Sequence, residues 1–201
     1  MNLPEMRTRI RRDLKDEDAQ NYRWSGEELD RHIDHALREF SKVLPREGKT
    51  EIATTAGSRD ISISSLSDRV GVFAVEYPTG KFPPSYQRFS LYQETITLLG
   101  DEVPNGSNCR IYYGKLHTLD AQSSSLPSQH EDTVALGAEG YALVEWAAYS
   151  INRVSVGGKE TPQDFRVRGE ELLSQFKREL TRLKSRLRSR QLYCPTTTPL
   201  S

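Results

Sequence analysis

The sequence is poor in the features that mark secreted, zinc-binding and membrane proteins. It has two cysteines, Cys109 and Cys194, and their wide separation gives neither a disulfide framework nor the spacing of a zinc site. No stretch approaches the roughly 20 apolar residues of a membrane-spanning helix, and the N-terminal segment MNLPEMRTRIRRDLKDED lacks the apolar core of a signal peptide. We therefore expect a protein made in a reducing cytoplasm, with no membrane span.

Motifs of the common enzyme and nucleotide-binding families are missing as well. The sequence contains no G-x-G-x-x-G, Walker loop, H-E-x-x-H or G-x-S-x-G. His32 and His35 lie close together on a predicted helix, but a metal site needs further ligands from another element. Both are placed opposite the apolar face of that helix, so we expect them on the surface. We expect no cofactor, no bound metal and no catalytic residue.

Net charge is also absent, because 28 basic and 28 acidic residues cancel, so the overall charge does not point to nucleic acid. Apolar residues make up 35% of the chain, below the roughly 45–50% of ordinary globular domains. A chain of this kind either has much exposed surface or completes its burial against partners.

Residues 3–44 have helical periodicity, interrupted by the polar link KDEDAQNYR. Ser25 and Glu28 have the spacing of a capping box at the start of the second helix, and Trp24 precedes them as part of a hydrophobic staple. We predict structural roles for these three residues. Pro45 and Gly48 are predicted to end the helix. The apolar positions are Leu3, Met6, Ile10 and Leu14, then Leu29, Ile33, Leu37, Phe40 and Leu44.

Residues 49–117 change to the alternation typical of β-strands. Turn signals at Ala56-Gly57, Gln93-Glu94 and Pro104-Asn105-Gly106 separate the runs, which predicts a small antiparallel unit of about five or six strands. The segment 78–85, PTGKFPPS, is predicted to be a projecting loop, because its prolines cannot donate to a central strand.

Residues 127–190 are helical again. The run TVALGAEGYALVEWAAYSINRV is apolar nearly all round, which predicts a buried helix with a structural Trp146 and small residues that permit close packing. Glu139 and Glu145 in this run need partners; a pair with an arginine is favoured, and a catalytic role is left open. A break at 156–158 and a cap at Thr161-Pro162 precede the last helix. Its apolar seam contains Phe165, Leu172, Leu173, Phe176, Leu180, Leu183 and Leu187.

The predicted fold class is α+β, with a helical bundle and an inserted small antiparallel β unit. The bundle is assigned to residues 1–48 and 127–190 and the β domain to residues 49–126. The long C-terminal helix is followed by a tail over 191–201, QLYCPTTTPLS, which has no periodicity and should be extended and disordered alone.

Basic residues are concentrated at the end of the last helix, with Glu179 as the only acid among them. One interpretation is a solvated helix face whose cations suit the C-terminal end of the helix dipole. The other is a surface that faces DNA or an acidic partner, without base-specific recognition, because no DNA-binding motif surrounds it. The run consists of Lys177, Arg178, Arg182, Lys184, Arg186, Arg188 and Arg190.

In combination, these features resemble the head-to-tail adaptor (connector, or head-completion) proteins of tailed bacteriophages. The resemblance is carried by MRTRIRRDLKDEDAQNYRWSGEELDRHIDHALREFSKVLP, by GSRDISISSLSDRVGVFAVEYPTGKFPPSYQRFSLYQETITLLG, and by IYYGKLHTLD and EGYALVEWAAYSINRV. An arginine-rich first helix, a W-S-x-x-E-L helix start, a β insertion, an alanine-rich buried helix and a long last helix follow in this order.

The resemblance implies a non-enzymatic virion protein of the phage neck. It implies a ring, typically of about twelve subunits, that docks on the portal protein, extends the channel for double-stranded DNA and offers a platform to the tail or to a stopper protein. We expect the basic helix end and the tail to contact the portal, through Lys177, Arg178, Arg182, Lys184, Arg186, Arg188, Arg190, Leu192, Tyr193 and Leu200.

Two other functions stay open. The first is a DNA-binding accessory protein that uses the basic helix, which salt-dependent binding to duplex DNA would indicate. The second is an enzyme whose site is assembled between subunits, although no nucleophile–base pair is visible in the sequence.

Overall fold

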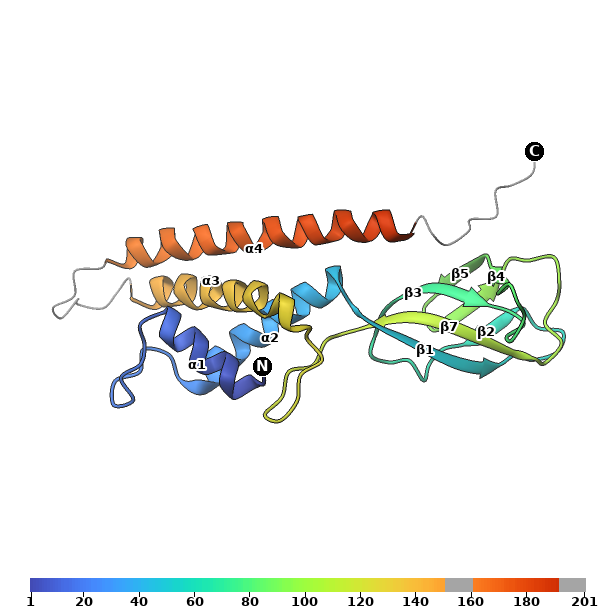
Figure 1. Cartoon of the computed structure of the whole chain (residues 1–201), viewed down its shortest axis with the longest axis horizontal. Coiled ribbons are helices and arrows are strands. Elements are labelled where there is room, and N and C mark those ends of the chain that lie inside the picture. Colours follow the sequence, from blue (N-terminus) through green and yellow to red (C-terminus); the bar gives the residue numbers. More distant parts are fainter. Residues whose placement is uncertain (151–160, 192–201) are drawn as a thin grey trace. The chain divides into compact units, whose positions relative to one another are not determined.

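A computed structural model of the chain describes residues 1–150 and 161–191, with side chains of the last helix as far as Ser185. The chain divides into two compact units (Figure 1). A helical unit contains the chain up to Leu44 and again from His117, and a β unit comprises Pro45–Leu116. The predicted α+β fold with a β insertion is confirmed, although the segment after His117 groups with the helices and not with the insertion.

The described part of the helical unit contains four α-helices. The first two begin at reciprocal caps, in which the cap side chain accepts from the backbone N–H three residues on, and the side chain of that residue accepts from the backbone N–H of the cap. Asn2 and Glu5 form one cap, and Ser25 and Glu28 form the one expected from the sequence, at 3.1 and 2.7 Å. The helices are α1 (Leu3–Asp13), α2 (Gly26–Val43), α3 (Glu131–Ser150, after a 3₁₀ turn at Ser128–His130) and α4 (Pro162–Gln191).

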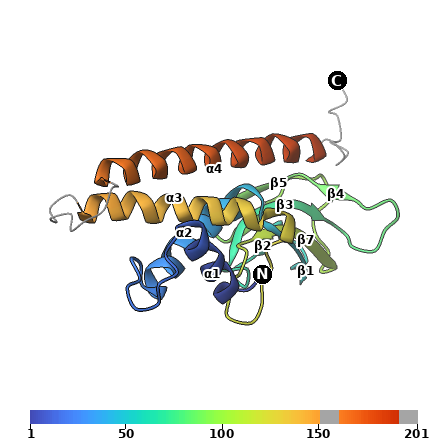
Figure 2. The same ribbon diagram turned by 60° about the vertical axis from the view of Figure 1, so that its left-hand side comes forward.

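Helices α3 and α4 lie side by side because glycines remove the side chains that would hold them apart (Figures 1 and 2). A Cβ atom on Gly140 would lie 2.8 Å from Leu173, and one on Gly137 would lie 3.0 Å from Phe176. Both distances are too short for an ordinary carbon contact, so larger residues at these positions require the helices to separate. The predicted break at 156–158 lies outside the described residues.

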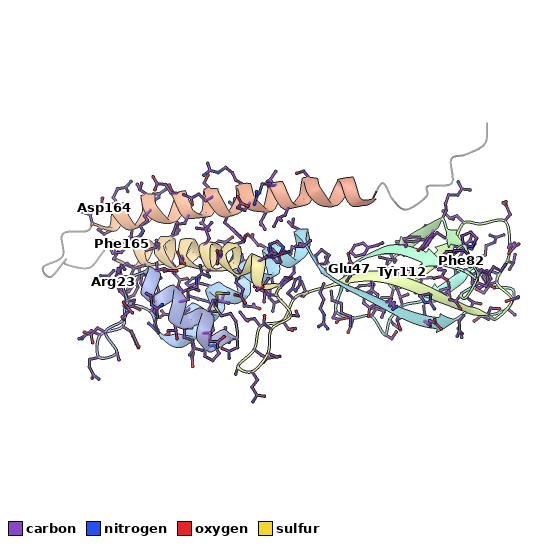
Figure 3. All side chains as sticks on the ribbon, viewed as in Figure 1. Arg23, Glu47, Phe82, Tyr112, Asp164 and Phe165 are labelled. Carbon is purple, nitrogen blue, oxygen red and sulfur yellow. The ribbon has the colours of Figure 1, made fainter. Side chains whose placement is uncertain are left out.

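The core of the helical unit forms where α3 meets the other three helices. The indole Nε1 of Trp24 donates to the carbonyl of Ala142 at 3.2 Å, and its ring lies 5.6 Å from that of Trp146. Phe165 starts the packing of α4, with the Arg23 guanidinium 5.1 Å from the centre of its ring (Figure 3). The buried side chains include Met6, Ile10, Leu29, Ile33, Phe40, Val134, Leu143 and Phe176.

The sequence suggested a simple polar link between α1 and α2. The structure differs, because the link contains a buried ion pair. Arg11 donates to Asp16 at 2.6 Å and to the carbonyl of Trp24 at 2.9 Å, and its guanidinium also covers the ring of Tyr22 at 3.6 Å. The Asp16 carboxylate accepts from the N–H of Arg23 at 2.7 Å. These bonds fix the position of Trp24 before helix α2 begins.

The predicted small antiparallel β unit is confirmed, but it consists of seven strands in two sheets where five or six strands were predicted. The four-stranded sheet has the order β1-β7-β3-β4, and the three-stranded sheet has the order β2-β6-β5. Their inner faces share a core that includes Ile61, Val75, Ile96 and Ile111. The strands are β1 (Arg46–Ala53), β2 (Asp60–Ser62), β3 (Arg69–Glu76), β4 (Tyr86–Gln87), β5 (Phe89–Tyr92), β6 (Thr95–Leu98) and β7 (Asn108–Lys115).

Three details of the β unit can be compared with the sequence prediction, and one of them differs. Gly48, predicted to end a helix, lies in strand β1, because α2 already stops at Val43. The turns expected at Ala56-Gly57 and Gln93-Glu94 are present, and the chain bends at Gly106; Gly57 and Gly106 have positive φ angles that favour glycine. Segment 78–85 forms the expected loop between β3 and β4.

Candidate attachment surface

The described cations of the basic run lie on the exposed side of helix α4. Lys177, Arg178, Arg182 and Lys184 are all exposed. Arg182 is paired with Glu179 at 2.7 Å, and Lys177 and Arg178 line a shallow hollow along the helix. The Arg182–Glu179 pair is exposed, so it contributes little to stability.

The other predicted attachment residues are described only in part. The backbone of α4 continues through the positions of Arg186, Arg188 and Arg190 to Gln191, but their side chains lie outside the described residues. Leu192, Tyr193 and Leu200 also lie outside them, so their assignment stays a prediction.

The apolar seam of α4 serves the helical unit itself over most of the described length. Leu180 is 8% exposed and Leu183 is 9% exposed, and both belong to the core. These two residues are therefore used inside the helical unit and do not form an exposed apolar surface. Helix α4 nevertheless continues past Leu183 and extends beyond the start of α3 (Figure 1).

His32 is buried, and the prediction that it lies on the surface is wrong. Its Nε2 atom is 3.3 Å from a carboxylate oxygen of Glu145, and burial lowers its pKa. The cause is the width of the apolar face of α2, because the positions of His32 and Ala36 are buried together with Leu29 and Ile33. His35 does lie on the exposed side, where it stacks on Tyr141 at 4.2 Å.

Glu139 and Glu145, the two carboxylates of α3 singled out in the sequence, both have partners. Glu145 pairs with Arg31 and faces His32, so it has the arginine that the sequence suggested. Glu139 is 9% exposed, and burial raises its pKa to about 7. A hydrogen bond with the carboxyl of Asp13 adds to this increase, whereas Arg9 and Arg168 oppose it.

The carboxyl pair formed by Glu139 and Asp13 lies in a hollow that is also lined by Arg9, Asp132 and Arg182. Arg9 is bonded to Asp132 at 2.6 Å, so cations and acids are interleaved across α1, α3 and α4. Thr133 and Glu179 complete the polar lining, so the hollow is a mixed electrostatic contact between helices.

Residues 1–150 and 161–191 contain no group of three or more histidine, cysteine or acidic side chains arranged to hold a metal ion. Within the same ranges, no helix has the length and apolar character required to cross a bilayer.

Sequence reasoning missed two features of the structure. The first is the buried Arg11–Asp16 pair, whose only signal is a set of charges next to Trp24. The second is a group of exposed apolar side chains on the loops of the β unit, Phe82, Leu99 and Val103. The composition of 78–85 predicted a loop there, but not that the side chain of Phe82 is exposed on it.

Comparison with known protein families gives one match that covers nearly the whole chain. Residues 1–199 match the family described as SU10 adaptor protein. No curated protein matches the sequence.

Proposed function

The chain belongs to the SU10 adaptor protein family, a family of phage head-to-tail adaptors, and from this membership we propose that it forms the connecting ring of a phage neck. In this proposal about twelve copies form a closed ring, as repeated heterologous interfaces allow. The ring docks on the portal protein of a DNA-filled head, extends the DNA channel, and offers a platform to the tail or a stopper protein. The match over residues 1–199 carries the proposal.

The physical character of the chain supports a role of this kind. Membership in a structural adaptor family implies a protein without catalytic activity and with other phage virion proteins as its partners. The zero net charge suits a channel through which DNA must pass without sticking. The low apolar content suits subunits that complete their burial against neighbours.

We assign attachment to the portal to residues 177–201, that is, to the basic end of α4 and the tail. The support is the exposure of Lys177, Arg178 and Lys184 on a helix that extends past the start of α3. An exposed cationic surface speeds the encounter with an acidic partner and fixes its orientation more than it adds affinity. The tail sequence, with Leu192, Tyr193 and Leu200 between prolines, suits an extended peptide that docks in pockets or on a sheet edge.

Truncation after Leu187 tests this assignment. The shortened protein should fold, because the described core of α4 ends at Leu183, but it should fail to join portal-bearing, DNA-filled heads. Cosedimentation of the protein with purified heads measures the joining. Equal joining by the truncated and full-length proteins would place attachment elsewhere in the chain.

A pair of charge reversals on α4 provides the matched control. Lys177→Glu should slow joining to heads, and the slowing should be largest at low salt, because electrostatic steering is screened by ions. Arg166→Glu changes the same charge on an exposed position near the other end of α4, where Arg166 is paired with Glu170. It should leave joining unchanged.

The basic run also keeps a second candidate, a DNA-binding accessory protein. If the isolated subunit binds duplex DNA, and its affinity falls steeply with salt concentration and is lost in Lys177→Glu, the run contacts phosphates. In the adaptor assignment, the isolated subunit shows no such binding.

A further inference from the structure

One end of the β unit gathers three loops, and the strand registers place them together. Ala53 at the end of β1 lies opposite Asn108 at the start of β7, and β3 ends beside the same part of β7. Leu98 at the end of β6 lies opposite Phe89 at the start of β5. The loops 54–59, 77–85 and 99–107 therefore share this end, which we call the tip. The chain enters and leaves the unit at the opposite end, at Arg46 and Lys115.

Hydrogen bonds between the loops make the tip an ordered surface. The buried hydroxyl of Tyr77 donates to the Asn105 side chain at 2.9 Å and accepts from the N–H of Asn105 at 2.8 Å. The N–H of Gly57 donates to the carbonyl of Pro104 at 2.8 Å, and that of Thr79 to the carbonyl of Asn108 at 3.2 Å. Loops tied in this way lose little conformational freedom when they bind a partner.

Apolar side chains are exposed on these ordered loops. Phe82 is 98% exposed, Leu99 is 50% exposed and Val103 is 48% exposed (Phe82 is labelled in Figure 3). Phe82 touches almost nothing within the unit, so it adds nothing to the stability of the fold. Single exposed apolar residues are ordinary, but aromatic rings are enriched at protein interfaces, and the loop that carries Phe82 is tied down at both ends by the bonds of Tyr77, Thr79 and Ser85.

The charges of the tip favour a protein partner over DNA. Arg59 and Lys81 are balanced by Asp101 and Glu102, so the three loops carry no excess of cations for phosphates. Arg59 is in addition bonded to the carbonyl of Asp101 at 3.1 Å. A neutral, partly apolar surface with one protruding ring matches an apolar pocket on another protein.

We propose that the tip is the surface by which this adaptor holds the next protein of the neck on the tail side, with Phe82 inserted into an apolar pocket of that protein. This inference rests on the proposed function, because an adaptor needs one surface for the head and another for the tail. Attachment to the portal is assigned to α4 in the helical unit, and the tip supplies a second surface on the other compact unit.

The test compares Phe82→Ser with Tyr92→Ser in the full-length protein. Tyr92 is 75% exposed in the hairpin between β5 and β6, at the opposite end of the unit, so it controls for loss of an exposed aromatic ring. Purified DNA-filled heads are loaded with each protein and then mixed with purified tails of the same phage. Bound adaptor and joined particles are counted separately.

Phe82→Ser should load onto heads like the unchanged protein, and its rate of tail joining should fall by about thirtyfold, as expected for the loss of one interface anchor. Tyr92→Ser should match the unchanged protein in both steps. Normal tail joining by Phe82→Ser overturns the inference. Failure of that variant to form rings or to load also overturns it, because Phe82 would then contact a second copy of this chain.

A second measurement separates the inference from the proposed function. Binding of each adaptor protein to isolated tails is measured without heads. If the unchanged protein binds tails but does not load onto heads, the portal assignment fails and the tip is still tested by Phe82→Ser. Equal binding of tails by Phe82→Ser and by the unchanged protein contradicts the role of the tip in either case.

Discussion

Substitution of Glu139 by glutamine should change how the stability of the protein depends on pH. The Glu139 carboxyl is 9% exposed, between helices α1, α3 and α4, and burial raises its pKa from an ordinary value of 4.5 to about 7. Its carboxyl neighbour Asp13 acts in the same direction, and the guanidinium groups of Arg9 and Arg168 act against it. Glutamine keeps the shape of the side chain and cannot ionise.

The sign of the effect follows from proton binding. Between pH 4.5 and about 7 the folded protein keeps a proton on Glu139 that the unfolded chain has lost. The protonated Glu139 therefore stabilises the folded protein fully below pH 4.5, and this stabilisation is lost as the pH rises to about 7. The difference between the two pKa values corresponds to about 3 kcal/mol, as an order of magnitude.

Urea unfolding of the unchanged protein and of Glu139→Gln, followed by circular dichroism from pH 4.5 to 8, measures this contribution. The variant should gain stability relative to the unchanged protein as the pH rises, by about 3 kcal/mol over the window. Glu171→Gln, at an exposed position of α4, removes the same charge and should show no such trend. Parallel stability curves for Glu139→Gln and the unchanged protein would refute the burial of an ionisable carboxyl here.

The remaining predictions concern the packing of the helical unit, and thermal unfolding measures each of them. Gly140→Leu should cost about 1–3 kcal/mol or more, because its side chain would meet Leu173, and an equally stable variant would mean that the two helices are not in close contact. Ser25→Ala should cost about 0.5–2 kcal/mol through loss of the cap, so an unchanged melting temperature would contradict the start of α2. Asp16→Asn should cost about 3 kcal/mol, because it leaves the buried guanidinium of Arg11 without its counter-charge; a loss below that of Ser25→Ala would argue that the pair is solvated.

Local patterns in the sequence predicted the elements well. Trp24, Ser25 and Glu28 marked the start of α2 because a capping box depends only on residues three apart. The change from helical to alternating periodicity marked the β insertion, because each periodicity reflects which faces are buried. The glycines of α3 pointed to close helix packing, and Gly140 and Gly137 do face α4.

What the sequence could not predict depends on contacts between distant segments. The spacing of apolar residues shows which side of a helix is buried, but not how wide the buried face is. His32 was therefore assigned to solvent, although it is buried against Glu145 of α3. The partner of Glu139 is Asp13, a residue 126 positions earlier, and no local pattern connects them. The division of the strands into two sheets, and the position of Phe82 on the tip, depend on registers that a single sequence does not specify.

The most direct test of the adaptor assignment is an image of the purified protein together with its portal protein. Negative-stain electron microscopy of the mixture should show a second ring stacked coaxially on the portal ring, with a continuous central channel. Portal rings that stay bare at saturating concentrations of this protein would contradict its role as the head-to-tail adaptor.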